Sequence, residues 1–288
     1  MKYLIFFIIL FFGCKAQRIK SHSYNKKIMV FLLAGQSNMD GRARAYNLTN
    51  EDLKRLEKVK NHVTLYYNHF KPVPLQVTIP TKYIQKKFSA KEVFGPELFF
   101  GINLSEKYPD KKIVLIKRSK GGMSLYGAWN SNWSLEKAKA MKEEDDPKLY
   151  SDFITYAKDV LSRFDTSEYE LSGMLWVQGE SDSGKQKFGT IPAESYEENL
   201  KNLIRGVRTE FNNSQLPFLI FQVGGGKVVK AMNKVASEDP FTVLIPQSKD
   251  KNSDLYFERN PPPIGHYKYN AMKKIGRLFF EYYENNFK

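Results

Sequence analysis

The stretch Phe31-Leu-Leu-Ala-Gly-Gln-Ser-Asn-Met-Asp-Gly41 carries more information than any other part of this chain. It continues an apolar run that starts at Ile28, is typical of a buried strand and stops at Gly35. Ser37 follows two residues later. In open α/β sheets, ligands bind beyond the carboxyl ends of the strands. Backbone N–H groups that follow such a strand can stabilise an oxyanion. The stretch therefore predicts a candidate nucleophile, Ser37, at the edge of a sheet.

Short apolar runs alternate with longer amphipathic segments along the chain. Because the runs do not alternate cleanly with polar residues, they predict strands buried on both faces of a parallel sheet. The expected strands are 29–34, 113–116, 173–177, 216–223 and 241–245. A period of 3.6 residues predicts helices over 96–107, 147–164, 196–211 and 269–287. This order predicts one α/β domain, residues 28–288, with helices on both faces of a sheet of about five strands. Segments 57–92 and 129–146 are expected to be surface elaborations.

Composition limits the classes of partner. The 288 residues include 42% hydrophobic and 14% aromatic side chains, enough for a sizeable core. With 45 Lys and Arg against 31 Asp and Glu, the formal net charge is +14, which favours anionic partners. However, the basic residues are scattered and accompany no nucleic-acid-binding motif. We therefore expect no nucleic-acid partner.

The first residues predict export. A basic start at Lys2 precedes an apolar run over residues 3–12, which is too short to span a bilayer as a helix. We interpret 1–16 as a signal peptide and 17–27 as a linker. Cys14, in Phe11-Phe12-Gly13-Cys14, resembles the lipobox of bacterial lipoproteins, in which the cysteine is acylated and anchors the protein to a membrane. The competing interpretation is ordinary cleavage after Ala16.

Both interpretations export the protein, either as a periplasmic or outer-membrane-anchored lipoprotein or as a secreted protein. Cys14 is the only cysteine. The mature domain is therefore expected to hold neither a disulfide nor a cysteine-based metal site.

Three further blocks follow predicted strands or open the last predicted helix. They are Gly121-Gly122-Met123-Ser124, Trp176-Val177-Gln178-Gly179-Glu180-Ser181-Asp182 and Gly265-His266-Tyr267-Lys268-Tyr269-Asn270. With Gly35-Gln36-Ser37-Asn38-Met39 they resemble the SGNH hydrolase superfamily, and within it the carbohydrate-esterase branch of sialate O-acetylesterases and acetylxylan esterases. The resemblance covers about residues 28–284. It implies a three-layer α/β/α fold with a flavodoxin-like parallel sheet.

The resemblance also implies roles for individual residues. Serine needs an adjacent base, and His266 occupies the family's position for it. The oxyanion donors would be the Ser37 N–H, a glycine N–H of the Gly121-Gly122 pair, with Gly122 as our choice, and the Gln178 side-chain amide.

Substrate contacts are expected from Gln36, Asn38 and Trp129. Trp129 could stack on a sugar ring or pack inside the protein.

The group that orients His266 is the main open point of the sequence. Many family members carry an aspartate three residues before this histidine, whereas this chain has Pro263. Glu180 could take the role, and we assign it to the catalytic set on that basis. A backbone carbonyl or Glu258 are the alternatives.

The function that follows is a serine esterase that removes acetyl groups from an acetylated oligo- or polysaccharide, such as a sialic acid or xylan-type glycan, through an acyl-enzyme. No metal or organic cofactor is expected. Pro263 motivates the alternative, a catalytically weak or inactive glycan-binding relative.

Overall fold

The fold is seen in a computed structural model that describes residues 27–262 and 264–288. The predicted signal peptide, Cys14 and Pro263 lie outside these residues. A central sheet has the strand order β4-β3-β6-β1-β7-β8-β9, and all neighbours pair in parallel except β3 and β4. Its strands are β1 (Ile28–Gly35), β3 (Val63–Tyr67), β4 (Val73–Pro74), β6 (Lys112–Ser119), β7 (Tyr169–Val177), β8 (Phe218–Phe221) and β9 (Thr242–Ile245). The predicted α/β fold is confirmed.

The number of strands differs from the prediction. The sheet has seven strands rather than about five. The five predicted strands are β1, β6, β7, β8 and β9, and their order in the sheet is the flavodoxin-like one. The additional strands β3 and β4 fall within 57–92, which was expected to be a surface elaboration. β3 has only five residues and its apolar side chains are interrupted by Thr64, so it gives a weak strand signal.

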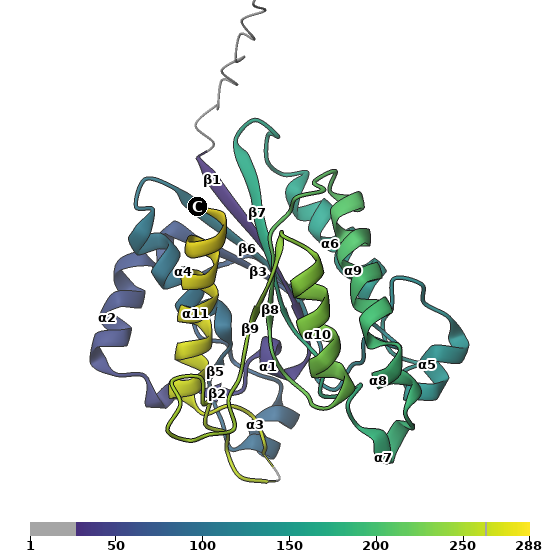
Figure 1. Ribbon diagram of the computed structural model, residues 1–288. Helices are drawn as coiled ribbons and strands as arrows, with labels where there is room; N and C mark the ends of the chain where they lie inside the picture. The colour runs from purple at the N-terminus through teal and green to yellow at the C-terminus, as the bar shows by residue number, and fades with distance from the viewer. Residues whose placement is uncertain (1–26, 263) are drawn as a thin grey trace, which may run out of the picture.

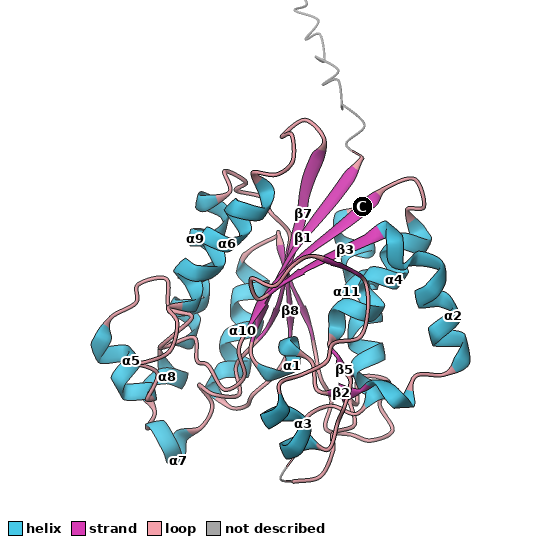
Figure 2. Cartoon of the chain, turned by 180° about the vertical axis from the view of Figure 1, so that it is seen from behind, coloured by secondary structure: helices cyan, strands magenta, loops and turns pink. Residues whose placement is uncertain are grey.

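Helices cover both faces of the sheet (Figure 1). The predicted four are present as α4 (Pro96–Lys107), α6 (Leu149–Leu161), α9 (Tyr196–Glu210) and α11 (Tyr269–Phe287). The view from behind shows α2, α4 and α11 on one side of the sheet and α6, α9 and α10 on the other (Figure 2). The remaining elements are α1 (Ser37–Asp40), β2 (Ala43–Arg44), η1 (Ala45–Asn47), α2 (Asn50–Val59), η2 (Lys60–His62), α3 (Lys82–Phe88), β5 (Val93–Phe94), α5 (Leu135–Met141), α7 (Lys185–Phe188), α8 (Ile191–Glu194) and α10 (Lys227–Glu238).

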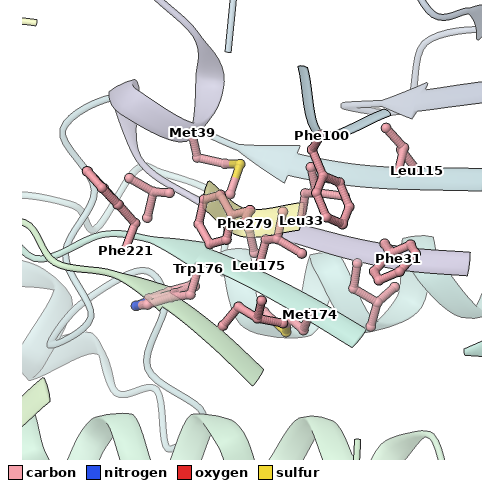
Figure 3. Close-up of a cluster of buried hydrophobic side chains, with 14 of the residues drawn as sticks. Phe31, Leu33, Met39, Phe100, Leu115, Met174, Leu175, Trp176, Phe221 and Phe279 are labelled. Atoms are coloured by element: carbon pink, nitrogen blue, oxygen red, sulfur yellow. The ribbon is translucent and has the colours of Figure 1, made fainter. Parts of the chain in front are cut away.

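The core is built around β1, the middle strand, whose eight residues are all buried. Phe31 meets Phe100 of α4 and Tyr283 of α11 edge to face, with ring centroids 4.9 Å apart in both pairs. Figure 3 shows how Leu33 and the side chains around it fill the space between sheet and helices. Each large apolar side chain buried in this way contributes roughly 1.5–3 kcal/mol to folding. The strand that leads to Ser37 is thus buried along its whole length.

Candidate active site

Ser37 lies where the middle strand ends and the first helical turn begins. Gly35 adopts φ +152°, and a side chain on it would collide with the carbonyl of Val177 on β7. Gln36 donates its N–H to that same carbonyl at 3.0 Å, and α1 then starts at Ser37. No described group accepts the N–H of Ser37. The chain therefore presents a partly exposed serine with an unused N–H at the switch point between β1 and β7.

The glycine block after β6 forms the wall opposite Ser37. A Cβ built on Gly121 would lie 3.4 Å from Ser37 Cβ and 3.5 Å from Arg42 Nη2, whereas one on Gly122 would meet nothing within 4 Å. Gly122 has φ +83° and its carbonyl accepts a 2.8 Å hydrogen bond from Ser181 Oγ. Within the described part of the chain, neither glycine N–H has an acceptor. Gly121 thus packs against the serine and Gly122 makes the turn, and both leave an N–H available.

Gln178 has a different surrounding from the one expected of an oxyanion donor. Its side chain is 0% exposed. Nε2 donates to Asp182 Oδ2 at 2.6 Å and to the Met123 carbonyl at 3.2 Å. Oε1 accepts from the Tyr196 hydroxyl at 3.1 Å. Because both amide protons are engaged, Gln178 joins the end of β7 to the glycine block and has no proton left for an oxyanion in this arrangement.

Two buried carboxylates hold the segment that follows the glycine block. Asp182 accepts the N–H groups of Leu125 and Tyr126, each at 2.9 Å. Glu143 accepts from the N–H and hydroxyl of Ser124 at 2.8 and 2.9 Å and from Ala128 N at 2.7 Å. Burial raises the pKa of Asp182 to about 6 and that of Glu143 to about 7. Sequence reasoning missed Glu143, since nothing in its neighbourhood in the chain marks it.

The three expected substrate contacts are all buried. Gln36 Oε1 accepts from the hydroxyl of Ser181 at 3.3 Å, and Asn38 Nδ2 donates to Glu180 Oε1 at 2.6 Å. Trp129 is 0% exposed and packs edge to face on Trp176 at 5.3 Å. Of the two roles left open for Trp129, packing is the one observed, because its ring fills the core beneath the site and presents no face to a sugar.

His266 lies in the loop before α11, partly exposed. The ring of Phe88 in α3 meets the imidazole edge to face at 5.0 Å. Among the described residues, no group accepts or donates a hydrogen bond at the buried Nδ1. The pKa of His266 is lowered to about 4, and burial is the largest cause, to which the positive charge of Arg42 adds. An interaction with the backbone of Ile264 partly offsets this and raises the pKa. The imidazole is therefore neutral, and able to take a proton, throughout the neutral and mildly acidic range.

The acids considered as partners of His266 are bound elsewhere. Glu180 Oε1 accepts from Asn38 and, at 3.2 Å, from Arg259 Nη1, while its Oε2 is buried without a partner among the described atoms. Glu258 pairs with Lys268. Neither carboxylate makes a hydrogen bond to the histidine in the described structure.

A buried charge network lies directly behind Ser37 and was not expected from the sequence. Arg42 pairs with Asp40, which also accepts hydrogen bonds from the hydroxyls of Tyr67 and, at 3.0 Å, Ser119. Lys117 Nζ donates to the Asp40 carbonyl at 3.0 Å. The available signal was the pair of charges in Asp40-Gly41-Arg42, immediately after an apolar strand and its serine turn.

Lys117 also forms an ion pair with Glu97 of α4 at 2.8 Å, and both side chains are 1% exposed. Among residues 27–262 and 264–288, histidine, cysteine and acidic side chains do not gather in threes in a way that could hold a metal ion. No helix in that part of the chain combines the length and apolar character needed to cross a membrane.

The serine turn and the glycine wall adjoin at the carboxyl ends of β1 and β6, and no described hydrogen bond joins Ser37 to His266. The family model of carbohydrate esterases described as sialic acid-specific acetylesterases matches residues 27–284. The chain belongs to this family. It is accordingly a carboxylic ester hydrolase of the carbohydrate acetylesterase type. No curated protein sequence matches it.

Solved structures share the fold of this acetylesterase at low sequence identity. A protein from Arabidopsis thaliana is 18% identical with a TM-score of 0.62, covering 90% of this chain and 99% of its own. NanS is 13% identical with a TM-score of 0.59, covering 90% and 97%. A carbohydrate acetylesterase from Xanthomonas citri is 17% identical with a TM-score of 0.55, covering 87% of this chain and 54% of its own.

Proposed function

We propose that this acetylesterase removes O-acetyl groups from an acetylated oligo- or polysaccharide by a serine mechanism, with Ser37 as nucleophile and His266 as base. The observation that carries the proposal is the placement of Ser37. Ser37 is the first residue of α1, at the end of the middle strand. It lies beside Gly121, and its backbone N–H has no acceptor among the described residues. This is the environment that an acyl-transfer nucleophile requires.

The steps follow from the charges around the two residues. Neutral His266 takes the proton of Ser37 Oγ as the oxygen attacks the acetyl carbonyl. The N–H groups of Ser37 and of the Gly121-Gly122 pair, with Gly122 as our choice, stabilise the oxyanion. The protonated imidazole gives its proton to the leaving sugar hydroxyl, and an acetyl-serine forms. His266 then takes a proton from water as the water attacks the acetyl-serine carbonyl. The bond between the acetyl group and Ser37 Oγ breaks, the imidazolium returns the proton to Oγ, and acetate leaves.

A carbohydrate substrate is supported by the surface next to the site. A cavity of about 530 Å³ is lined by Glu180, by glycines 224–226, Val229 and Ser248, and by amide and cationic side chains. These groups include Gln222, Gln247, Lys230, Lys249 and Arg259. Amides can bind sugar hydroxyls, and cations suit a carboxylate, so an acidic glycan such as a sialic acid or uronate-bearing xylan fits this surface.

The test is acetate release from acetylated glycans by purified protein. We expect Ser37→Ala and His266→Ala each to lower kcat by several orders of magnitude. Unchanged thermal unfolding would show that the variants fold. Equal acetate release by wild type and Ser37→Ala would refute the serine mechanism.

We also propose that residues 1–16 direct export. Expression of the full chain in a bacterium, followed by mass measurement of the mature N-terminus, tests this. An acylated N-terminus at Cys14 would identify the lipoprotein form, an N-terminus at Gln17 would identify ordinary cleavage, and retention of Met1 in the cytoplasm would refute export.

A further inference from the structure

We propose that Arg259 is a positioning residue for His266, and that Glu180 acts on the histidine through Arg259 rather than through a hydrogen bond to Nδ1. This inference rests on the proposed function, because it assigns how the base of that mechanism is held. Where many family members have an aspartate that binds the imidazole, Arg259 would instead hold the backbone of the loop that carries His266. We call this contact of Arg259 with the loop the brace.

Glu180 binds two partners in the site through one carboxylate oxygen. Its Oε1 is shared between Asn38 Nδ2 at 2.6 Å and Arg259 Nη1 at 3.2 Å. A carboxylate oxygen that accepts from both sides in this way is committed to those partners. His266 Nδ1, by contrast, has no hydrogen-bond partner within the described part of the chain. Glu180 therefore meets the histidine loop at Arg259.

The second step is how Arg259 holds that loop. Nη1 also donates to the carbonyl of Gly265 at 3.4 Å, and Nη2 donates to the hydroxyl of Tyr267 at 2.5 Å. The guanidinium lies over the Tyr267 ring, 4.1 Å from its centroid. The partners of Arg259 are thus the two residues that flank His266. Tyr267 is itself buried and receives a 2.7 Å hydrogen bond from Gln247 Nε2, so the anchor is fixed.

The two ends of the same loop are paired through their backbones. Arg259 and Tyr267 form an antiparallel bridge. Asn260 donates to the His266 carbonyl twice, from its N–H at 2.8 Å and from Nδ2 at 3.1 Å. The backbone position of His266 is therefore determined by the residues at the base of the loop, and Phe88 limits the ring from one side.

The third step connects the base to the nucleophile. Asn38 directly follows Ser37 and is 2% exposed, so its side chain is fixed relative to the serine turn. From there, contacts run through Glu180 to Arg259 and on to the residues that flank His266. This route links the serine turn to the histidine loop. Displacements of about 1 Å at such a pair can reduce rate by about 10²-fold.

Arg259 also affects the charge around His266. The cations that lower the pKa of His266 are Arg42, which follows α1, Arg259 in the loop itself and Lys87 in α3. Removing Arg259 removes one of these cations and also leaves Glu180 without its ion pair. Loss of the cation raises the pKa of His266. A role limited to overall stability would not move it.

The experiment compares Arg259→Met with Arg277→Met in the full chain. Arg277 is a matched control, because it pairs with Glu281 on the exposed side of α11 and touches no site residue. For Arg259→Met we expect kcat to fall by about 10²-fold with little change in KM. We also expect the acid limb of kcat/KM to move to higher pH. Arg259→Lys should retain part of kcat, since lysine keeps the positive charge but lacks the two donor nitrogens of the guanidinium.

A second measurement needs no substrate. In protein carrying labelled histidine, the NMR titration of His266 should move upward in Arg259→Met and stay in place in Arg277→Met. Combining Arg259→Met with Glu180→Gln should cost less than the sum of the two single losses, because both remove the same contact.

The outcomes separate the two proposals. An unchanged kcat and titration in Arg259→Met would overturn the brace. So would a Glu180→Gln variant that loses activity and shifts His266 while Arg259→Met does neither, because the carboxylate would then act on Nδ1 directly. If the wild type releases no acetate but the His266 titration still moves in Arg259→Met relative to wild type, the esterase mechanism is refuted and the contact between Arg259 and the histidine loop is not.

Discussion

Gln178 donates a 2.6 Å hydrogen bond to Asp182 Oδ2, and this pair joins the end of β7 to the segment after β6. Asp182 accepts in addition from the N–H groups of Leu125 and Tyr126. Gln178 reaches the same segment through the Met123 carbonyl. The conspicuous polar side chains of this block thus bind one another and the backbone, and they fix the glycine wall opposite Ser37.

Asp182→Ala tests that role. Three buried donors would lose their acceptor, at about 1–3 kcal/mol each, so we expect a loss of at least about 3 kcal/mol in the free energy of unfolding. Acetate release should fall as well, because the glycine wall loses its support. Chemical denaturation and kinetics measure the two effects. Asp250→Ala is the matched control, since that exposed carboxylate accepts only from Asn252 N among the described side-chain contacts.

The buried ion pair behind the site gives a second prediction. Lys117→Met should lower the free energy of unfolding by about 3–5 kcal/mol, because it leaves Glu97 charged and without its partner in the interior. Adding Glu97→Gln removes that charge while keeping an acceptor for Gly95 N. The double variant should therefore be more stable than Lys117→Met alone. A double variant that is less stable would contradict this explanation of the pair.

The lowered pKa of His266 predicts activity in acid. With a pKa of about 4 in the free enzyme, the contribution of His266 to kcat/KM should stay level from neutral pH to about pH 5 and then fall with a midpoint near 4. Arg42→Gln should move that midpoint upward, because the cation at Arg42 disfavours the imidazolium. A midpoint near the ordinary histidine value of about 6.5 in wild type would refute the electrostatic description of the site.

The same shift makes a prediction about stability. The unfolded chain takes up a proton at His266 near pH 6.5 and the folded protein only near 4, so folding loses stability as the pH falls across that interval. Subtracting the pH dependence of His266→Gln from that of wild type isolates this contribution. A difference that is flat between pH 7 and pH 4 would show that the pKa of His266 is not lowered in the folded protein.

The two glycines opposite Ser37 should respond differently. Gly121→Ala places a methyl group 3.4 Å from Ser37 Cβ, so we expect kcat/KM to fall while the melting temperature changes little. Gly122→Ala meets open space but forces alanine to φ +83°, which costs about 1–2 kcal/mol. Here stability should fall first. The reverse pattern, measured by kinetics and thermal unfolding together, would mean that Gly122 faces the serine.

Local patterns were enough to predict much of the fold. The strand leading to Ser37 is continuous in sequence and buried on all sides, so its apolar run is unambiguous. The amphipathic repeats of α4, α6, α9 and α11 are equally local. β3 was missed because a strand of only five residues, interrupted by Thr64, gives a weak apolar signal.

The position of Ser37 and the family of this chain followed from the sequence alone, because consecutive residues encode a strand, a tight turn and a short helix. The contacts of Gln178, Glu180 and Trp129 are visible only in the tertiary structure. A side chain's partner depends on residues far along the chain, as Glu180 lies 142 positions from Asn38 and 79 from Arg259. A hydrogen bond of this kind depends on the distance between two groups in space, and the number of residues between them in the sequence does not determine that distance.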